Sequence, residues 1–185
     1  NTSSEQLSST LSLPTNQTST VNASALLASK VALTGSNNAV NGGFDSSWGK
    51  LNVNDWKGSV QGDYYQLTDY TGDANHVIVP NDADFEKAGI STSGKQVGVT
   101  SDLMNSIFTS NPYGINDVTV AFSKTDNKMV KAIDSNWYNT WQSYAFFLRS
   151  TSLSKFDGTS LDVSNVTNMS YMFFGSKSDR SHVVL

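Results

Sequence analysis

The chain has 185 residues, of which 37% are hydrophobic and 15% charged, and its formal net charge is −4 at pH 7. This length suffices for one domain with a sizeable core, or for a small domain with a tail. The acidic balance offers no basic field for phosphate backbones, which argues against nucleic-acid binding. Cysteine is absent, which excludes zinc-thiolate, iron–sulfur and thiol-redox chemistry. No run reaches the roughly 18 apolar residues of a spanning helix, so no membrane insertion is expected.

Residues 1–40 are expected to form a low-complexity tail or spacer. Residues 1–24 contain seven Ser, five Thr, three Asn and two Gln, and Glu5 is their single charged residue. Such a segment cannot bury enough apolar area to offset the entropy that it loses on ordering. The start at Asn1 is consistent with a signal peptide that has been removed, which predicts an exported protein.

Residues 41–135 are predicted to form a mixed α/β domain whose folded part begins near Phe44. Residues 64–69 have the aromatic and β-branched content that is typical of a strand. Residues 77–79 form a short apolar run that Pro80 ends, and this run predicts a second strand.

A short helix is expected over residues 82–88. Asn81 can cap its first turn, and Asp84 follows three positions later, as in a capping box. Gly89 is placed to end the helix in a left-handed conformation.

A third strand over residues 97–99 and a second helix are expected to follow. Either Thr100 or Ser101 can cap this helix. Pro112 and Gly114 are placed to end it. Four apolar residues share one of its faces: Leu103, Met104, Ile107 and Phe108.

Residues 117–123 place Val118, Val120 and Phe122 on one face at period two. Residues 128–133 follow after a short turn. This pattern predicts either a hairpin or a pair of repeat strands.

A repeat occupies the last third of the chain. Residues 170–174, SYMFF, echo residues 143–147, SYAFF, at an offset of 27 positions (170 − 143). A period of about 20 to 30 residues with an apolar and asparagine skeleton belongs to the leucine-rich class of solenoids. We therefore expect residues 136–185 to be the truncated start of such a solenoid, with a strand at residues 153–156.

The repeat predicts a structural role for its regularly spaced residues. Val166, Met169, Met172 and Phe173 are expected to be buried between coils. Asn165 and Asn168 are expected to satisfy backbone groups inside the turns. The full set of structural repeat residues is Leu161, Val163, Asn165, Val166, Asn168, Met169, Met172 and Phe173.

Residues 161–173, LDVSNVTNMSYMF, resemble the repeat of the BspA-like leucine-rich-repeat surface proteins of lactobacilli and mycoplasmas. The preceding segment also resembles the region before the repeats in the Lactobacillus members, and the likeness covers roughly residues 44–178. The resemblance implies a secreted, cell-wall-associated Gram-positive protein with a role in adhesion. Since only one good and one degenerate repeat are present, the chain is expected to be the N-terminal piece of a longer protein.

The expected fold is α+β, with a small mixed capping domain that leads into a leucine-rich-repeat-like solenoid. The expected function is that of a monomeric, non-catalytic adhesin, which recognises a host glycan, mucin or extracellular protein without a cofactor. One alternative is a structural cap or spacer with no ligand of its own. A more distant alternative is a carbohydrate-binding module that uses the aromatic segment.

Four aromatic residues are the candidate ligand-binding residues: Trp48, Trp56, Tyr64 and Tyr65. They stand among Asn, Asp and Gln, and such aromatic rings offer rigid contact area for the face of a sugar. The same rings could instead fill the core of a cap that covers the first coil of a solenoid.

Metal binding and catalysis have weaker signals. Asp82, Asp84 and Glu86 alternate, but they lack the central glycine and distal glutamate of a calcium loop, and helix capping explains them. His76 and His182 lie in no recognisable catalytic motif. We therefore expect no metal site and no enzymatic activity.

Overall fold

The computed structural model describes residues 39–109, 118–137, 153–170, 172 and 183–184. The chain divides into two units, of which one combines Asn1–Val40 with Thr125–Asn127. The other unit combines Asn41–Lys124 with Lys128–Leu185 and holds both described α-helices and all the described strands. Residues 1–38 of the expected tail lie outside the described residues.

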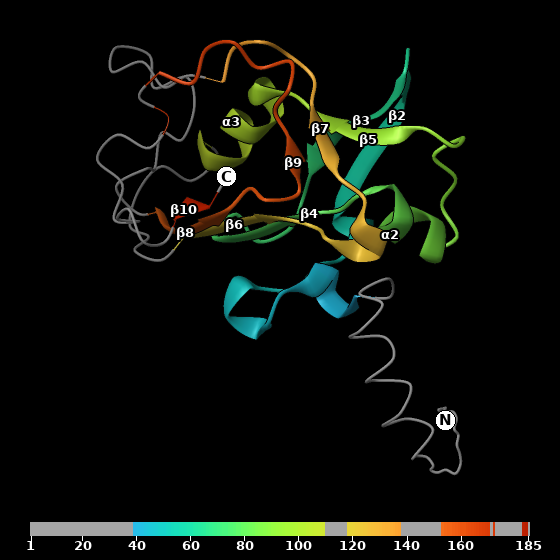
Figure 1. Cartoon of the computed structure of the whole chain (residues 1–185). Coiled ribbons are helices and arrows are strands. Elements are labelled where there is room, and N and C mark those ends of the chain that lie inside the picture. Colours follow the sequence, from blue (N-terminus) through green and yellow to red (C-terminus); the bar gives the residue numbers. More distant parts are fainter. Residues whose placement is uncertain (1–38, 110–117, 138–152, 171, 173–182, 185) are drawn as a thin grey trace. The chain divides into compact units, whose positions relative to one another are not determined.

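Two sheets form the body of the second unit (Figure 1). The five-stranded sheet has the order β2 (Trp56–Gln61), β3 (Tyr64–Tyr70), β5 (Gln96–Val99), β7 (Val130–Ala132) and β9 (Leu161–Asp162). The four-stranded sheet has the order β10 (Val183–Val184), β8 (Leu153–Asp157), β6 (Val118–Phe122) and β4 (His76–Val79). The strands expected at residues 64–69, 77–79, 97–99 and 153–156 are thereby confirmed.

From β3 to β10 the chain enters the two sheets alternately, and every neighbouring pair of these strands is parallel. Only β2, which pairs with β3, is antiparallel. Phe156 pairs with Val183, and their separation of 27 positions (183 − 156) equals the offset of the sequence repeat. The repeat itself stays a prediction, because residues 138–152 and 173–182 lie outside the described part of the chain.

A common apolar core lies between the two sheets. Alternate residues of β3, β4, β5, β6 and β7 point into it, and the Phe122 and Phe156 rings meet edge to face at 5.9 Å. The strands of the five-stranded sheet contribute Trp56, Tyr65, Leu67, Val97, Val99, Val130, Ala132 and Leu161, and those of the four-stranded sheet Val77, Val79, Val118, Val120, Phe122, Leu153 and Phe156. Burial of this shared face holds the two sheets together.

The predicted alternation in β6 is confirmed, but the hairpin is not formed. Val118, Val120 and Phe122 all face the common core. β6 and β7, however, belong to different sheets, and each has only parallel partners. The hairpin alternative is therefore wrong, because both strands pair with segments that lie far away in the sequence.

The outer face of the four-stranded sheet is covered by the segment between two short helices, η1 (Val40–Gly43) and η3 (Val53–Asp55). This segment contains a third short helix, η2 (Ser46–Trp48). Phe44, Trp48 and Leu51 pack there against Ile78 and Ala121. Two lysines cover the rings, since the Lys124 Nζ lies 4.8 Å from the Phe44 centroid and the Lys155 Nζ 4.3 Å from that of Trp48. This cover explains why β6 is buried on both faces.

Helix α2 (Asp82–Lys87) forms as the capping pattern predicts. The Asn81 Oδ1 accepts from the Asp84 backbone N at 3.1 Å, and the Asp84 Oδ2 accepts from the Asn81 backbone N at 2.9 Å. Gly89 follows with a φ of 78°, the left-handed value that suits glycine. The helix buries Phe85, whose ring packs on that of Tyr65 at 5.2 Å.

Replacing Asn81 by alanine is expected to lower the free energy of unfolding by about 2 kcal/mol. The change removes the cap of α2 and the side-chain amide that donates to the Ser123 carbonyl at 3.3 Å in a buried position. Urea unfolding measures the loss. Asn81→Ser retains a cap acceptor but not the amide and adds no charge, so a loss as large as that of alanine would contradict the assigned role of the cap.

Helix α3 (Ser101–Thr109) is also confirmed, with Thr100 as its cap. The Thr100 Oγ1 accepts from the Leu103 backbone N at 3.2 Å. Leu103, Met104 and Ile107 lie in the common core, as expected, whereas the Phe108 side chain, Pro112 and Gly114 lie outside the described part. No helix in the described ranges is long and apolar enough to cross a membrane.

A buried lysine joins β7 to β9 and to the segment that follows β9. Lys131 is only 8% exposed, and its Nζ lies 3.2 Å from the Asp162 Oδ2 and 2.7 Å from the Ser164 Oγ. The Asp162 Oδ1 also accepts from the Ser164 backbone N at 2.9 Å. The hydrogen bonds from Ser164 and the Lys131 ammonium together hold the pKa of Asp162 below its usual value.

This lowered pKa predicts a loss of stability in acid. The unfolded-state pKa of an aspartate is about 3.9. Because the folded-state pKa lies lower, the stabilisation is fully present above about pH 4 and is lost as the pH falls through the folded-state value. Urea unfolding between pH 6 and pH 2 should show a shallower acid loss for Asp162→Asn than for the wild type. Identical slopes would contradict this role of Asp162.

Candidate functional site

The structure does not bring the four candidate aromatic residues together on one surface. Trp56 and Tyr65 are 5% and 9% exposed and belong to the common core. Trp48 is half-buried and packs against Phe44, on the outer face of the other sheet. Tyr64 is half-buried, and its Cβ lies beside the bare backbone of Gly98. Trp48 and Tyr64 are therefore the members that reach the surface.

The structural repeat residues lie at the edge of the core. Leu161 and Met172 are buried, whereas Val163, Val166 and Met169 are half-buried and pack against the core. The Trp137 backbone N also donates to the Asn168 carbonyl at 2.8 Å. This hydrogen bond joins the repeat segment to the residues after β7.

The two asparagines of the repeat differ in their surroundings. The Asn168 Oδ1 accepts from the Ser170 backbone N at 3.0 Å, so its side chain stabilises a turn, as expected of it. Asn165 is exposed, and no hydrogen bond of its side chain is formed within the described residues. Phe173 lies outside the described residues.

The alternating carboxylates of α2 have three different partners. Asp84 closes the capping box, and the Glu86 Oε2 accepts from the Thr92 Oγ1 at 3.1 Å. Burial raises the pKa of Asp82, against the opposing effect of the Lys128 ammonium at 3.8 Å. Among the residues that the structure describes, no three His, Asp or Glu side chains are grouped so that they could hold a metal ion.

The other displaced pKa values also have local causes. Burial alone would raise the pKa of Asp157, but hydrogen bonds from Thr159 and the Lys124 ammonium at 3.1 Å hold it below its usual value. Burial raises the pKa of Tyr70, and the carboxylates of Asp55 and Asp73 add to this effect. These groups lie at separate places in the fold.

A small hollow of about 200 Å³ is lined by His76 together with Asp55, Tyr70 and Asp73. The Thr119 hydroxyl donates to the Trp48 carbonyl at 3.2 Å, and the His76 Nδ1 lies 2.9 Å from the same hydroxyl oxygen. His76 therefore donates its Nδ1 proton to Thr119, which fixes the ring in place. The other candidate histidine, His182, lies outside the described part of the chain.

A larger cleft lies between β3 and α3, and its origin is the unequal length of two neighbouring strands. β5 pairs with β3 only from Tyr64 to Gln66 and ends at Val99, where the chain turns into α3. β3 continues to Tyr70, so its last residues have α3 beside them instead of a strand. A helix cannot continue the ladder, and the space left between the two elements is about 400 Å³.

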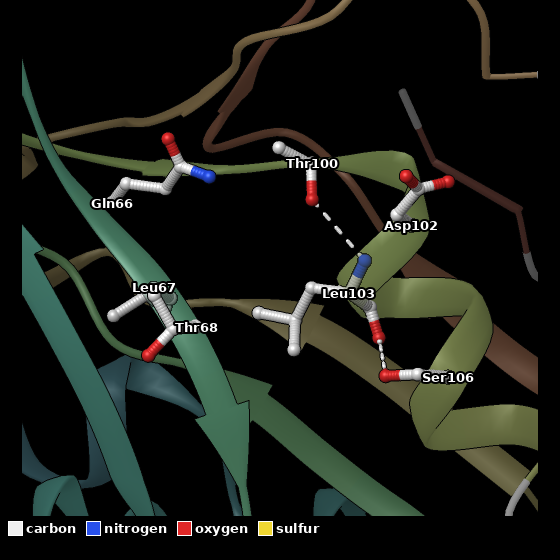
Figure 2. Close-up of a pocket in the computed structure, with 7 residues that line it drawn as sticks. All are labelled: Gln66, Leu67, Thr68, Thr100, Asp102, Leu103 and Ser106. Atoms are coloured by element: carbon white, nitrogen blue, oxygen red, sulfur yellow. Dashed lines mark hydrogen bonds between the residues drawn. The ribbon is translucent and has the colours of Figure 1, made fainter. Parts of the chain in front are cut away.

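Figure 2 shows the side chains that line this cleft. Leu103 extends from α3 towards β3, and Leu67 and Leu103 are both buried at the base of the cleft. The Gln66 carboxamide extends towards Thr100. The lining residues are Gln66, Leu67, Thr68, Thr100, Asp102, Leu103 and Ser106.

The polar groups of the cleft are partly committed to the protein. The Thr100 hydroxyl caps α3, and the Ser106 Oγ donates to the Leu103 carbonyl at 2.7 Å. The side chains of Gln66 and Asp102, in contrast, have no hydrogen-bond or ion-pair partner within the described ranges. The cleft thus presents a carboxamide and a carboxylate that have no partner among the described side chains.

Comparisons with models of known families, with curated proteins and with solved structures find no match. The residues of the cleft were not among the sequence candidates. Asp102 and Ser106 are four positions apart on the polar face of a predictable helix, but nothing in the sequence indicates that Gln66 lies opposite them. Only the pairing of β3 with β5 brings these residues together.

Proposed function

We propose that this chain is a non-catalytic bacterial surface protein that recognises a host or cell-wall ligand through an extended surface. The observation that carries the proposal is the parallel stacking in both sheets, because each further passage of the chain adds one strand to each sheet. Such stacking produces long, continuous faces that suit the binding of extended ligands. The resemblance of residues 161–173 to the BspA-like repeat supports an extracellular, cell-wall-associated location.

The absence of a catalytic role in this proposal is supported by where the titratable groups lie. Catalysis requires two or three such groups that converge in one pocket. Several titratable residues, among them His76, Asp55, Tyr70 and Asp73, do line one hollow. The Tyr70 hydroxyl, however, donates to the Asp73 carbonyl at 2.8 Å, and the His76 Nδ1 lies 2.9 Å from the Thr119 Oγ1. The displaced carboxylates of Asp157 and Asp162 are each engaged by a lysine, in different sheets. Each displacement has a structural explanation within the described part of the chain.

A structural cap or spacer is the second candidate function, and the burial of Trp56 and Tyr65 favours it. Rings that form the core cannot contact a ligand without unfolding. The antiparallel strand β2 at the edge of β3 also suits a cap, since it ends the series of parallel strands on that side. A carbohydrate-binding module built on the aromatic segment would have to rely on Trp48 and Tyr64.

A binding screen of the full chain distinguishes the two candidates. The screen presents host glycans, purified mucin, cell-wall polysaccharide and extracellular-matrix proteins. The proposed function predicts saturable binding to at least one of these ligands. If none of them is bound by a folded chain, the recognition role is overturned and the cap or spacer is favoured.

A further inference from the structure

We propose that the cleft between β3 and α3 binds a neutral, hydroxyl-rich group, such as one sugar residue of a glycan. This ligand class rests on the proposed function, since it specifies what the recognition surface would bind. The volume of about 400 Å³ falls within the range of roughly 300 to 1,000 Å³ that is usual for ligand sites. The cleft is built from regular elements, so its walls are held in place by the core.

Free hydrogen-bonding groups in the cleft point to a ligand with hydroxyls. The Gln66 carboxamide has both donors and acceptors, and the Asp102 carboxylate has only acceptors. Neither side chain has a partner within the described residues. The Thr100 Oγ1 accepts from the Leu103 backbone N, so its own proton stays available to a ligand. A hydroxyl group, which both donates and accepts, can satisfy all three of these side chains.

The base of the cleft is part of the apolar core. Leu67 and Leu103 are only 1% and 8% exposed, so they fix the walls of the cleft and offer a ligand almost no surface. A sugar ring has C–H groups on its faces and hydroxyls around its edge. The hydroxyls at the edge of such a ring can reach Gln66, Thr100 and Asp102, which line the cleft.

Charge selects a neutral ligand over an anionic one. The N-terminus of α3 would by itself attract an anion. Asp102, however, lies in the first turn of the helix and is the one charged side chain among the described residues that line the cleft. Its carboxylate opposes the helix dipole and repels acidic groups. Neutral glycans should therefore bind more tightly than their sialylated forms.

Binding of the full chain to an array of matched neutral and sialylated host glycans tests this proposal. The best-bound neutral glycan then serves as the probe for affinity measurements. Gln66→Ala removes a hydrogen bond to a ligand hydroxyl, and Asp102→Asn replaces a charged acceptor by a weaker neutral one. Each is expected to weaken binding about tenfold. Circular dichroism checks that each variant is folded.

Two control variants make the same chemical changes outside the cleft. Gln61→Ala alters an exposed glutamine at the end of β2, and Asp63→Asn alters an exposed aspartate in the turn before β3. Both should bind the glycan as the wild type does. A loss in these controls equal to that of the cleft variants would overturn the proposal, because the effect would then be one of surface charge or stability.

The remaining outcomes separate this inference from the proposed function. If the wild type binds a neutral glycan and the cleft variants bind it equally well, the cleft is not the site, but recognition stands. Preference for sialylated forms would overturn the assignment of a neutral ligand. Binding only to a matrix protein would overturn the sugar class and keep recognition. Binding to no ligand would overturn both.

Discussion

Replacing Trp56 by alanine is expected to lower the free energy of unfolding by about 3 to 5 kcal/mol, as for other large buried aromatic residues. Trp56 is 5% exposed, lies in the common core and packs against the Tyr70 ring, with the ring centroids 4.3 Å apart and the planes tilted by 39°. Its removal leaves a cavity where β2 meets the core. Urea unfolding followed by circular dichroism measures this change. If the loss is as large as the whole free energy of unfolding of the wild type, the variant will be unfolded even without urea.

Trp48→Ala is the matched control for this prediction. The same residue type is half-buried here and belongs to the smaller cluster around Phe44 and Ile78. Its ring packs on Phe44 at 5.2 Å and lies beneath the Lys155 ammonium. The expected loss is about 1 to 2 kcal/mol. Equal losses for the two tryptophans would contradict the division of the aromatic segment between core and surface.

Asp134→Ala is expected to lower the free energy of unfolding by about 3 kcal/mol. Hydrogen bonds to a charged acceptor are strong, and the substitution leaves the donors that now bind this carboxylate without a partner. The Asp134 Oδ1 accepts from the Ser101 backbone N at 3.0 Å and from the indole Nε1 of Trp137 at 2.8 Å. Its Oδ2 accepts from the Ser101 hydroxyl. Asp134 thus joins the start of α3 to a fully buried tryptophan.

Asp134→Asn tests the same network with its shape preserved. The asparagine keeps one carbonyl acceptor, so about half of the loss is expected from urea unfolding. Hydrogen exchange should also show faster opening of α3 in Asp134→Ala. An Asp134→Ala variant as stable as the wild type would contradict the anchoring role of this carboxylate.

Local features of the fold could be predicted from the sequence because their causes lie within a few residues. Asn81, Asp84 and Gly89 are enough to define the start and end of α2. The alternation of Val118, Val120 and Phe122 likewise predicts which face of β6 is buried. These features depend on backbone conformation and on the period of the side chains, and both can be read from the sequence.

Long-range pairing could not be predicted in this way. Residues 118–123 and 128–133 have the pattern of a hairpin, yet β6 and β7 lie in different sheets. The decisive contacts join residues some thirty positions apart, such as Val130 with Leu161. The sequence repeat indicates such a spacing only in the C-terminal part of the chain, whereas the parallel pairing already begins at β3 and β4.

The candidate site shows the same limit. Aromatic residues that are neighbours in the sequence separate in the structure, because Tyr64 and Tyr65 point to opposite faces of one strand. The cleft arises because β5 ends at Val99 while β3 continues, a difference that appears only after the strands have paired. Gln66 and Asp102 therefore have no signal in the sequence that would mark them as partners.

The most direct test of this account compares the affinities of two full-chain variants for the best-bound ligand of the binding screen. Trp48→Ala changes the aromatic segment at the surface, and Asp102→Asn changes the cleft. The account predicts that Trp48→Ala retains the affinity of the wild type and that Asp102→Asn weakens it about tenfold. The reverse result, a loss with Trp48→Ala and none with Asp102→Asn, would contradict the account and return recognition to the aromatic residues.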